Sequence, residues 1–244
     1  MPNRRKRKKQ MKWDLLLDAL ERRRVGVSVI VPAVFEEERP VYELLSGMPL
    51  IVRTLMALNQ MPQVEEIILV VRETEIFRMA DLCKVFSLDL VKKVVAAKEV
   101  GLSPLMVGVY ECKGEASYIA VCDPLCPFVT EPVLKEAITA AEEHGAGAPA
   151  YEVRDTIKIV QDDVVCETPD RTSLRVLQSP LVVESSLLKA ALQKAHGSEA
   201  QTGDVPQILE DFGLFLRLVE GREENIRIAQ VTDIPAAEAI LQWR

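Results

Sequence analysis

The chain has 244 residues, 48% of them hydrophobic and 27% charged, which is ordinary for a globular protein and enough for one large α/β domain with a sizeable core. No apolar run reaches the roughly 18 residues that cross a bilayer, and no apolar segment follows the basic N-terminus, so we expect neither a membrane span nor a secretory signal. The net charge is −7, but residues 1–24 hold ten Lys and Arg against three Asp and Glu, which leaves 20 against 34 in the rest. Because so acidic a body repels phosphates, we expect nucleic-acid binding, if any, only through the basic tail.

The cysteines indicate a reducing compartment. Their number, five, is odd for a chain of this size, and they show no paired spacing. We therefore expect a cytoplasmic protein with buried thiols rather than a disulfide framework. A zinc site would need further ligands at finger-like spacing, and neither of the two histidines is near a cysteine pair in sequence. The thiols concerned are Cys83, Cys112, Cys122, Cys126 and Cys166.

Residues 1–24 are set apart from the rest of the chain. Residues 2–10 form a block of like charge that is typical of a disordered tail. An amphipathic helix follows, with Trp13, Leu16, Leu17 and Leu20 on one face. Docking of this helix on the body or on a partner, contact of the tail with RNA or an anionic membrane, and a simply solvated tail all stay open.

From residue 27 the pattern alternates between strand and helix. We predict strands at 27–32, 66–71, 91–97 and 117–123, and helices at 49–60, 74–86, 102–112 and 131–147, the last with a glycine stop. Because the strands are continuously apolar, they favour a mostly parallel sheet with helices on both faces.

The alternation breaks after His144. Two short runs, IKIV and VVCE, flank Gln161-Asp162-Asp163 and predict a hairpin with too little apolar surface to stand alone, for which a second subunit is a natural support. The α/β pattern then resumes. We predict helices at 181–197, 204–213 and 231–243 and strands at 215–221 and 225–230.

Five stretches occur in this order along the chain: GMPLIVRTLMAL, VCDPLCPFV, PAYEVRDTIKIV, ETPDRTSLRVLQSP and LVEGREENIRIAQVTDIPAAEAIL. Together they resemble the 2-C-methyl-D-erythritol 4-phosphate cytidylyltransferases, the CTP-dependent enzymes of the non-mevalonate isoprenoid pathway. The resemblance implies a Rossmann-like nucleotidyltransferase fold, in a single domain at 25–244, and a homodimer built through a β-arm at roughly 150–180.

On the nucleotide side, the resemblance leaves only part of the family's site in place. The family's first loop has two glycines and a nearby lysine; here Arg39 persists, but both glycines and the lysine are missing. Three consecutive glutamates, at 36–38, would bring like charge to a triphosphate, whereas glycine backbone amides and a lysine attract it. Asp123 matches the family's metal and ribose-side aspartate, so Mg²⁺ is the implied cofactor. Cys122 and Cys126 stand where the family has a histidine and an arginine.

On the substrate side, the resemblance is better preserved. It assigns methylerythritol phosphate binding to Arg154, Asp155, Thr156 and Lys158, and a catalytic role to Arg227 together with Arg39. Four of the residues that match the family also have a purely structural interpretation. Arg154 and Asp155 would pair across the arm in an ordinary dimer contact, Asp123 would cap the turn after its strand, and Arg39 would form a surface ion pair.

Three functions follow. The first is a non-catalytic relative, with weak or no CTP-dependent activity, whose arm completes the site of a partner, in a homodimer or with a catalytic paralogue. The alternative is a working cytidylyltransferase that binds CTP and methylerythritol phosphate. The third is a pocket reshaped for a less anionic substrate, for which no residue constellation indicates the chemistry.

Overall fold

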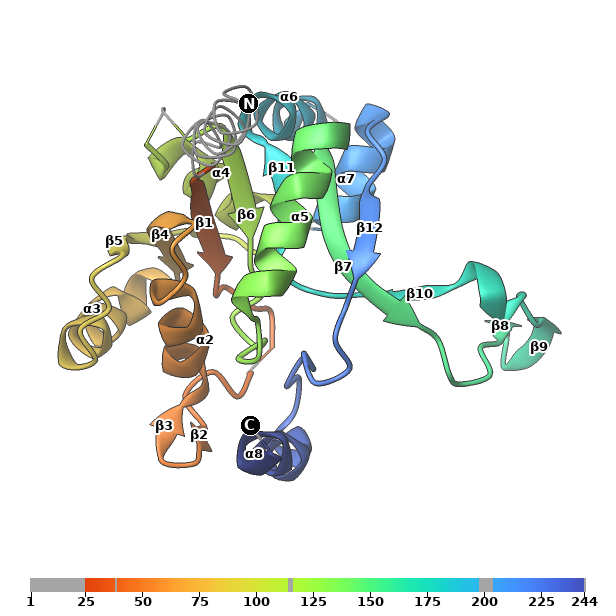
Figure 1. Ribbon diagram of the computed structural model, residues 1–244, viewed down its shortest axis with the longest axis horizontal. Coiled ribbons are helices and arrows are strands. Elements are labelled where there is room, and N and C mark those ends of the chain that lie inside the picture. The colour runs from red at the N-terminus through yellow and green to blue at the C-terminus, as the bar shows by residue number, and fades with distance from the viewer. Residues whose placement is uncertain (1–24, 38, 114–115, 198–203, 244) are drawn as a thin grey trace, which may run out of the picture.

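The computed structural model describes residues 25–37, 39–113, 116–197 and 204–243, so the predicted tail and helix at 1–24 lie outside the described residues. The centre of the molecule is an eight-stranded sheet with the order β10-β7-β11-β6-β1-β4-β5, in which β12 also pairs with β7 (Figure 1). Its strands are β1 (Val27–Pro32), β4 (Val64–Val71), β5 (Val91–Ala96), β6 (Tyr118–Val121), β7 (Ala146–Glu152), β10 (Arg175–Leu177), β11 (Leu181–Glu184) and β12 (Arg217–Glu220).

The pairing confirms a mostly parallel sheet. Strand β1 pairs in parallel with β4 and β6, β4 with β5, and β12 with β7, while β10 and β11 run antiparallel to their neighbours. Two further strands, β2 (Leu44–Leu45) and β3 (Met48–Pro49), form a small separate ladder.

Helices cover both faces of the sheet, as the continuously apolar strands predict. Side chains alternate along β1, so Val29 and Val31 face one core and Ile30 faces the other. The first core packs against α2 (Leu50–Asn59), α3 (Ile76–Val85), α5 (Glu131–His144) and α8 (Ile234–Trp243); the second packs against α4 (Leu102–Glu111), α6 (Ser185–His196) and α7 (Val205–Phe212).

Close packing of α4 on β1 requires a glycine. A Cβ added at Gly108 would lie 2.4 Å from Cγ2 of Ile30, far inside van der Waals contact. The α5 helix ends at Gly145 with φ 85°, the left-handed conformation that glycine adopts without strain, which confirms the predicted glycine stop.

Two predicted elements are wrong and one strand was missed. Residues 181–184 are strand β11 rather than the first turn of a helix, because a short apolar run does not distinguish a buried strand from a buried helix. Residues 225–230 are not a strand; Ile228 packs into the first core, and its N–H donates to the carbonyl of Leu125 in a neighbouring loop. Strand β7 was not predicted, since AGAPAYE has no strand-like composition.

The predicted hairpin is confirmed. Strands β8 (Ile159–Gln161) and β9 (Val164–Glu167) pair antiparallel around Asp162 and Asp163, whose φ angles of 48° and 62° suit a two-residue hairpin turn. The hairpin is exposed and projects from the sheet beyond β7 and β10 (Figure 1). We call residues 153–174 the arm.

The expectation of buried thiols holds for only part of the set. Cys122 and Cys126 are buried, Cys83 and Cys112 are partly buried, and Cys166 is exposed on β9, where the narrow hairpin has no core to bury it. None of the described helices is long and apolar enough to span a membrane.

Candidate functional site

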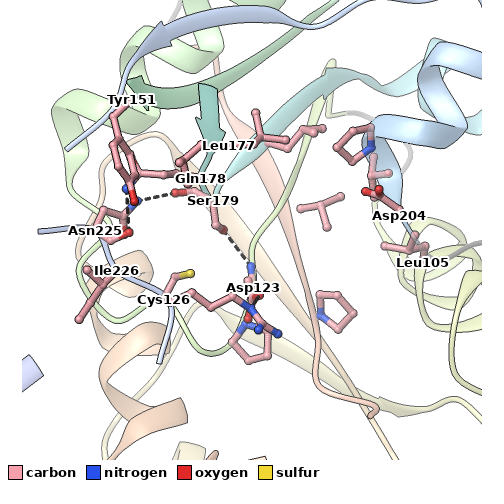
Figure 2. A pocket seen from close by; sticks show the side chains of 18 of the residues that line it. Leu105, Asp123, Cys126, Tyr151, Leu177, Gln178, Ser179, Asp204, Asn225 and Ile226 are labelled. Carbon is pink, nitrogen blue, oxygen red and sulfur yellow. Dashed lines mark hydrogen bonds and ion pairs between the residues drawn. The ribbon is translucent and has the colours of Figure 1, made fainter. Parts of the chain in front are cut away.

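A cleft of about 620 Å³ opens at the carboxyl ends of β1 and β6. These strands are parallel neighbours at the centre of the sheet. From β1 the sheet continues on one side through β4 and β5, and from β6 it continues on the other side through β11 and β7. Ligands in open α/β sheets bind at such a switch point. Figure 2 labels six of the polar side chains that line the cleft: Asp123, Cys126, Gln178, Ser179, Asp204 and Asn225. Phe35 and Arg227 belong to the same lining.

Asp123 and Arg227 meet in this cleft. The Nε of Arg227 donates to Oδ2 of Asp123 at 2.5 Å, while Oδ1 accepts the N–H of Leu125 at 2.8 Å. The second bond is an aspartate turn of the kind that stabilises the chain after a strand. Asp123 therefore has the structural role expected of it and at the same time presents its carboxylate to the cleft.

A set of hydrogen bonds holds the Arg227 segment against the sheet. The amide of Gln178 donates to the carbonyls of Arg222 and Asn225 at 2.7 and 2.9 Å and accepts the N–H of Arg222 at 3.0 Å. Nδ2 of Asn225 donates to the carbonyl of Ser179 at 2.7 Å. The hydroxyl of Ser179 in turn accepts the N–H of Asp123 at 2.9 Å, so one network positions both members of the ion pair (Figure 2).

The cleft has more acidic than basic charge. Among the described residues that line it, the charged side chains are the carboxylates of Asp123 and Asp204 and one cation, Arg227, which is paired with Asp123. Cys126 stands where the family has an arginine, and burial raises the pKa of its thiol well above the usual value, so it is neutral at pH 7. Burial likewise raises the pKa of Cys122 to about 12.

The loop after β1 contributes an apolar side chain to the cleft. Phe35 lines it, and its carbonyl accepts a hydrogen bond from the guanidinium of Arg72. None of the described residues 33–37 and 39–41 has a positive φ, so this part of the loop lacks the alternating backbone of an anion-binding nest.

Arg39 is not among the residues that line the cleft. Its Nη2 lies 3.7 Å from Oε2 of Glu37, whose side chain is 80% exposed. In the structure Arg39 therefore forms the surface ion pair that its structural interpretation expects.

The four arm residues lie apart from the cleft of their own chain. Arg154 pairs with Glu223 and lines a different hollow, at the base of the arm. Lys158 donates to Oγ1 of Thr168 at 2.7 Å, and Asp155 and Thr156 are exposed. Within its own chain Arg154 is engaged by Glu223, and its pairing with Asp155 across a dimer contact, which needs a second subunit, stays a prediction.

The donor set for a divalent cation is small. Among the described residues no three His, Cys, Asp or Glu side chains form a metal-binding group. Both oxygens of Asp123 already accept hydrogen bonds. A Mg²⁺ ion needs only one or two protein carboxylates when substrate phosphates complete its shell, so Asp123 fits such an ion through the lone pairs that its two hydrogen bonds leave free.

From the sequence, Gln178 and Ser179 were noted only as matches to a family motif on the substrate side, without a role, and Asn225 was not singled out. The signal was present, because Gln178 and Ser179 belong to LQSP and Asn225 to NIRI, both within stretches that resemble the family. Their role as a scaffold appears only when the hydrogen bonds between the two segments are seen.

Comparisons with known proteins agree with this architecture. The family model described as "IspD: 2-C-methyl-D-erythritol 4-phosphate cytidylyltransferase" matches residues 28–243. The enzyme of that name from Alkaliphilus metalliredigens is 32% identical over 205 residues, which is 83% of this chain and 85% of the relative. One from Bacillus cereus is 31% identical over 228 residues, covering 88% and 97% of the two chains.

Solved structures give the same result. The crystal structure of 4-diphosphocytidyl-2C-methyl-D-erythritol synthase from Anaerococcus prevotii superposes with a TM-score of 0.79 at 25% identity, over 90% of this chain and 99% of that one. The cytidylyltransferase from Thermus thermophilus, at 21% identity and a TM-score of 0.71 over 89% and 99% of the two chains, shares the fold. The chain therefore belongs to the 2-C-methyl-D-erythritol 4-phosphate cytidylyltransferase family.

Proposed function

We propose that this family member has weak or no CTP-dependent transferase activity of its own and acts through its arm, which completes the substrate pocket of a partner subunit. The observation that carries the proposal is the charge of the cleft: the described residues that line it include two carboxylates and one arginine, and that arginine pairs with Asp123.

A triphosphate gains little attraction from such a cleft. The missing glycines, lysine and arginine are the groups that stabilise transferring phosphoryl oxygens, and each charged contact of that kind contributes roughly 2–4 kcal/mol. Glu36 and Glu37 are exposed on the loop beside Phe35 and bring like charge instead. One like-charge pair at 4 Å costs about 1 kcal/mol in water and about 4 kcal/mol at an effective dielectric constant of 20.

The arm is better preserved than the loop. Arg154, Asp155, Thr156 and Lys158 match the family's substrate-side motif, and they lie on a segment that projects away from the chain's own sheet (Figure 1). In the family, the arm of one subunit contributes to the pocket of its partner. The partner is a second copy of this chain or a catalytic paralogue that supplies an intact nucleotide loop.

A working cytidylyltransferase is the second candidate, favoured by the meeting of Asp123 and Arg227 in the cleft. A phosphate oxygen of methylerythritol phosphate would attack the α-phosphorus of CTP, and the bond to the β-phosphate oxygen would break to release pyrophosphate. Arg227, with the partner subunit's arm, would hold the substrate phosphate, Arg39 would stabilise the transferring group, and Asp123 would hold Mg²⁺, which supplies charge neutralisation at the phosphates.

Pyrophosphate release separates the two candidates. The purified protein is assayed with CTP, methylerythritol phosphate and Mg²⁺, alone and mixed with a catalytic family member whose own arm arginine has been replaced by alanine. We expect little release from either protein alone and restored release from the mixture, but no restoration by the Arg154→Ala variant of this chain. Release by the isolated protein at the rate of an intact family member would overturn the proposal.

A further inference from the structure

The arm and the segment that carries Arg227 leave the sheet side by side. Strands β7 and β12 are parallel, and Ala150 is the register partner of Glu220. Gly221 continues this pairing, since its N–H donates to the carbonyl of Ala150 at 2.8 Å. The start of the arm and the turn at residues 221–225 therefore emerge at one edge of the sheet (Figure 1). Residues of both line the hollow at the base of the arm, which measures about 500 Å³.

Arg154 is held in this hollow through its side chain and through its backbone. Its guanidinium pairs with the carboxylate of Glu223, on the turn after β12. Its carbonyl accepts a hydrogen bond from Nη1 of Arg171 at 3.1 Å, from the part of the arm that returns to the sheet. Among the ion pairs that join described residues, the Arg154–Glu223 pair is the one that lies in this hollow. The cation that the arm would offer to a partner is thus engaged by its own chain.

The turn that carries Glu223 is anchored and cannot follow the arm. The amide of Gln178, which follows β10, donates to the carbonyls of Arg222 and Asn225 at 2.7 and 2.9 Å and accepts the N–H of Arg222 at 3.0 Å. The N–H of Asn225 donates to the carbonyl of Arg222 at 2.9 Å and closes the turn. The Arg154–Glu223 pair therefore ties the arm to the body of the same chain.

A carboxylate in this position opposes the binding of a phosphate by Arg154. If the ion pair persists while Arg154 contacts a phosphate, Glu223 brings like charge close to it. If Arg154 leaves Glu223 to reach the phosphate, the free energy of the ion pair is lost. Both routes weaken the contact between Arg154 and a phosphate in a partner's pocket.

We propose that Glu223 restrains Arg154, so that the arm delivers its cation to a partner's substrate phosphate only in competition with its own chain. The inference rests on the proposed function, in which Arg154 completes the pocket of a partner subunit. Because the two side chains are 75% and 53% exposed, solvent screens the pair, and we expect an effect of up to about fivefold. Glu223 is thus a positioning residue that regulates the arm.

Modification of Arg154 by phenylglyoxal tests the restraint in the isolated protein. The reagent attacks guanidinium groups, and peptide mass spectrometry reports the rate at Arg154 relative to the exposed Arg217. We expect Glu223→Gln to raise the rate at Arg154 by about two- to fivefold. Glu224→Gln is the matched control, because it removes the same charge from an exposed neighbour that forms none of the ion pairs between described residues. Equal rates at Arg154 in the two variants and the unaltered chain would overturn the inference.

The consequence for a partner is measured in the mixture with the catalytic family member that lacks its own arm arginine. Glu223→Gln should lower the KM for methylerythritol phosphate by about two- to fivefold and leave kcat unchanged, and Glu224→Gln should change neither. Restored pyrophosphate release with an equal or higher KM for Glu223→Gln would overturn the restraint alone. Absence of restored release with every form of this chain would overturn the proposed function, and the inference with it.

Discussion

Replacing Gln178 with alanine tests whether its side chain holds the Arg227 segment in place. The amide makes three hydrogen bonds to the backbone of Arg222 and Asn225, and all three groups lose their partner in the variant. Each such bond contributes about 0.5–1.5 kcal/mol net. Because two of the three lie in exposed surroundings, where water replaces the lost partner, we expect a loss of about 1–2 kcal/mol in the free energy of unfolding rather than the full sum.

The measurement is urea unfolding followed by circular dichroism, with the thermal midpoint as a second readout. For a chain of this size, 1 kcal/mol corresponds to roughly 2–4 °C, so the midpoint should fall by about 2–8 °C. Gln207→Ala is the matched control, since Gln207 makes only a surface bond to Asp211 one helical turn away, of a kind worth about 0.2–0.5 kcal/mol. An equal effect of the two substitutions would refute the argument that Gln178 joins two segments of the fold.

Two further predictions concern the buried thiol and the arm. Burial raises the pKa of Cys122 to about 12, so above pH 9 the unfolded chain releases the thiol proton while the folded chain keeps it. The stability should therefore fall by up to about 1.4 kcal/mol per pH unit between pH 9 and 12. Cys122→Ala should flatten this decline in urea titrations, Cys166→Ser on the exposed arm should not, and an unchanged slope in Cys122→Ala would contradict the assignment. Ile159→Glu with Val164→Glu on the arm should convert a dimer into monomers in light scattering, because both side chains are about half or more exposed and need a partner surface. Val85→Glu, at a 74% exposed position on α3, should leave the mass unchanged; a dimer that survives the double substitution would exclude the arm as its interface.

The sheet was largely predictable because its central strands are buried on both faces. Runs such as VSVIVP and EIILVV have no polar face and are too short for typical helices, so only a covered parallel sheet accommodates them. The same property caused Leu181–Glu184 to be predicted as helix. This buried strand continues directly into α6, and no residue in the apolar run marks where the strand ends and the helix begins. Strand β7 lacks β-branched residues altogether and depends on its neighbours for its conformation.

The site was predictable only in part. Asp123 and Arg227 are 104 residues apart, and no periodicity relates them; the resemblance to a family named both, and the structure joins them. Arg39 was expected at the nucleotide, and in the structure it lies by Glu37 and is not among the residues that line the cleft. The contacts of Gln178 and Asn225 depend on how two distant segments pack, which a single sequence does not encode locally.

Calorimetric titration with CTP in the presence of Mg²⁺ tests most directly whether the cleft of this chain binds a nucleoside triphosphate by itself. A family member that keeps the glycine loop serves as the positive control, and the Glu36→Gln with Glu37→Gln variant removes the like charge from the loop. We predict no binding up to millimolar CTP for this chain and measurable, weak binding for the double variant. Micromolar binding by the unaltered chain would contradict this prediction and make the working cytidylyltransferase the better description.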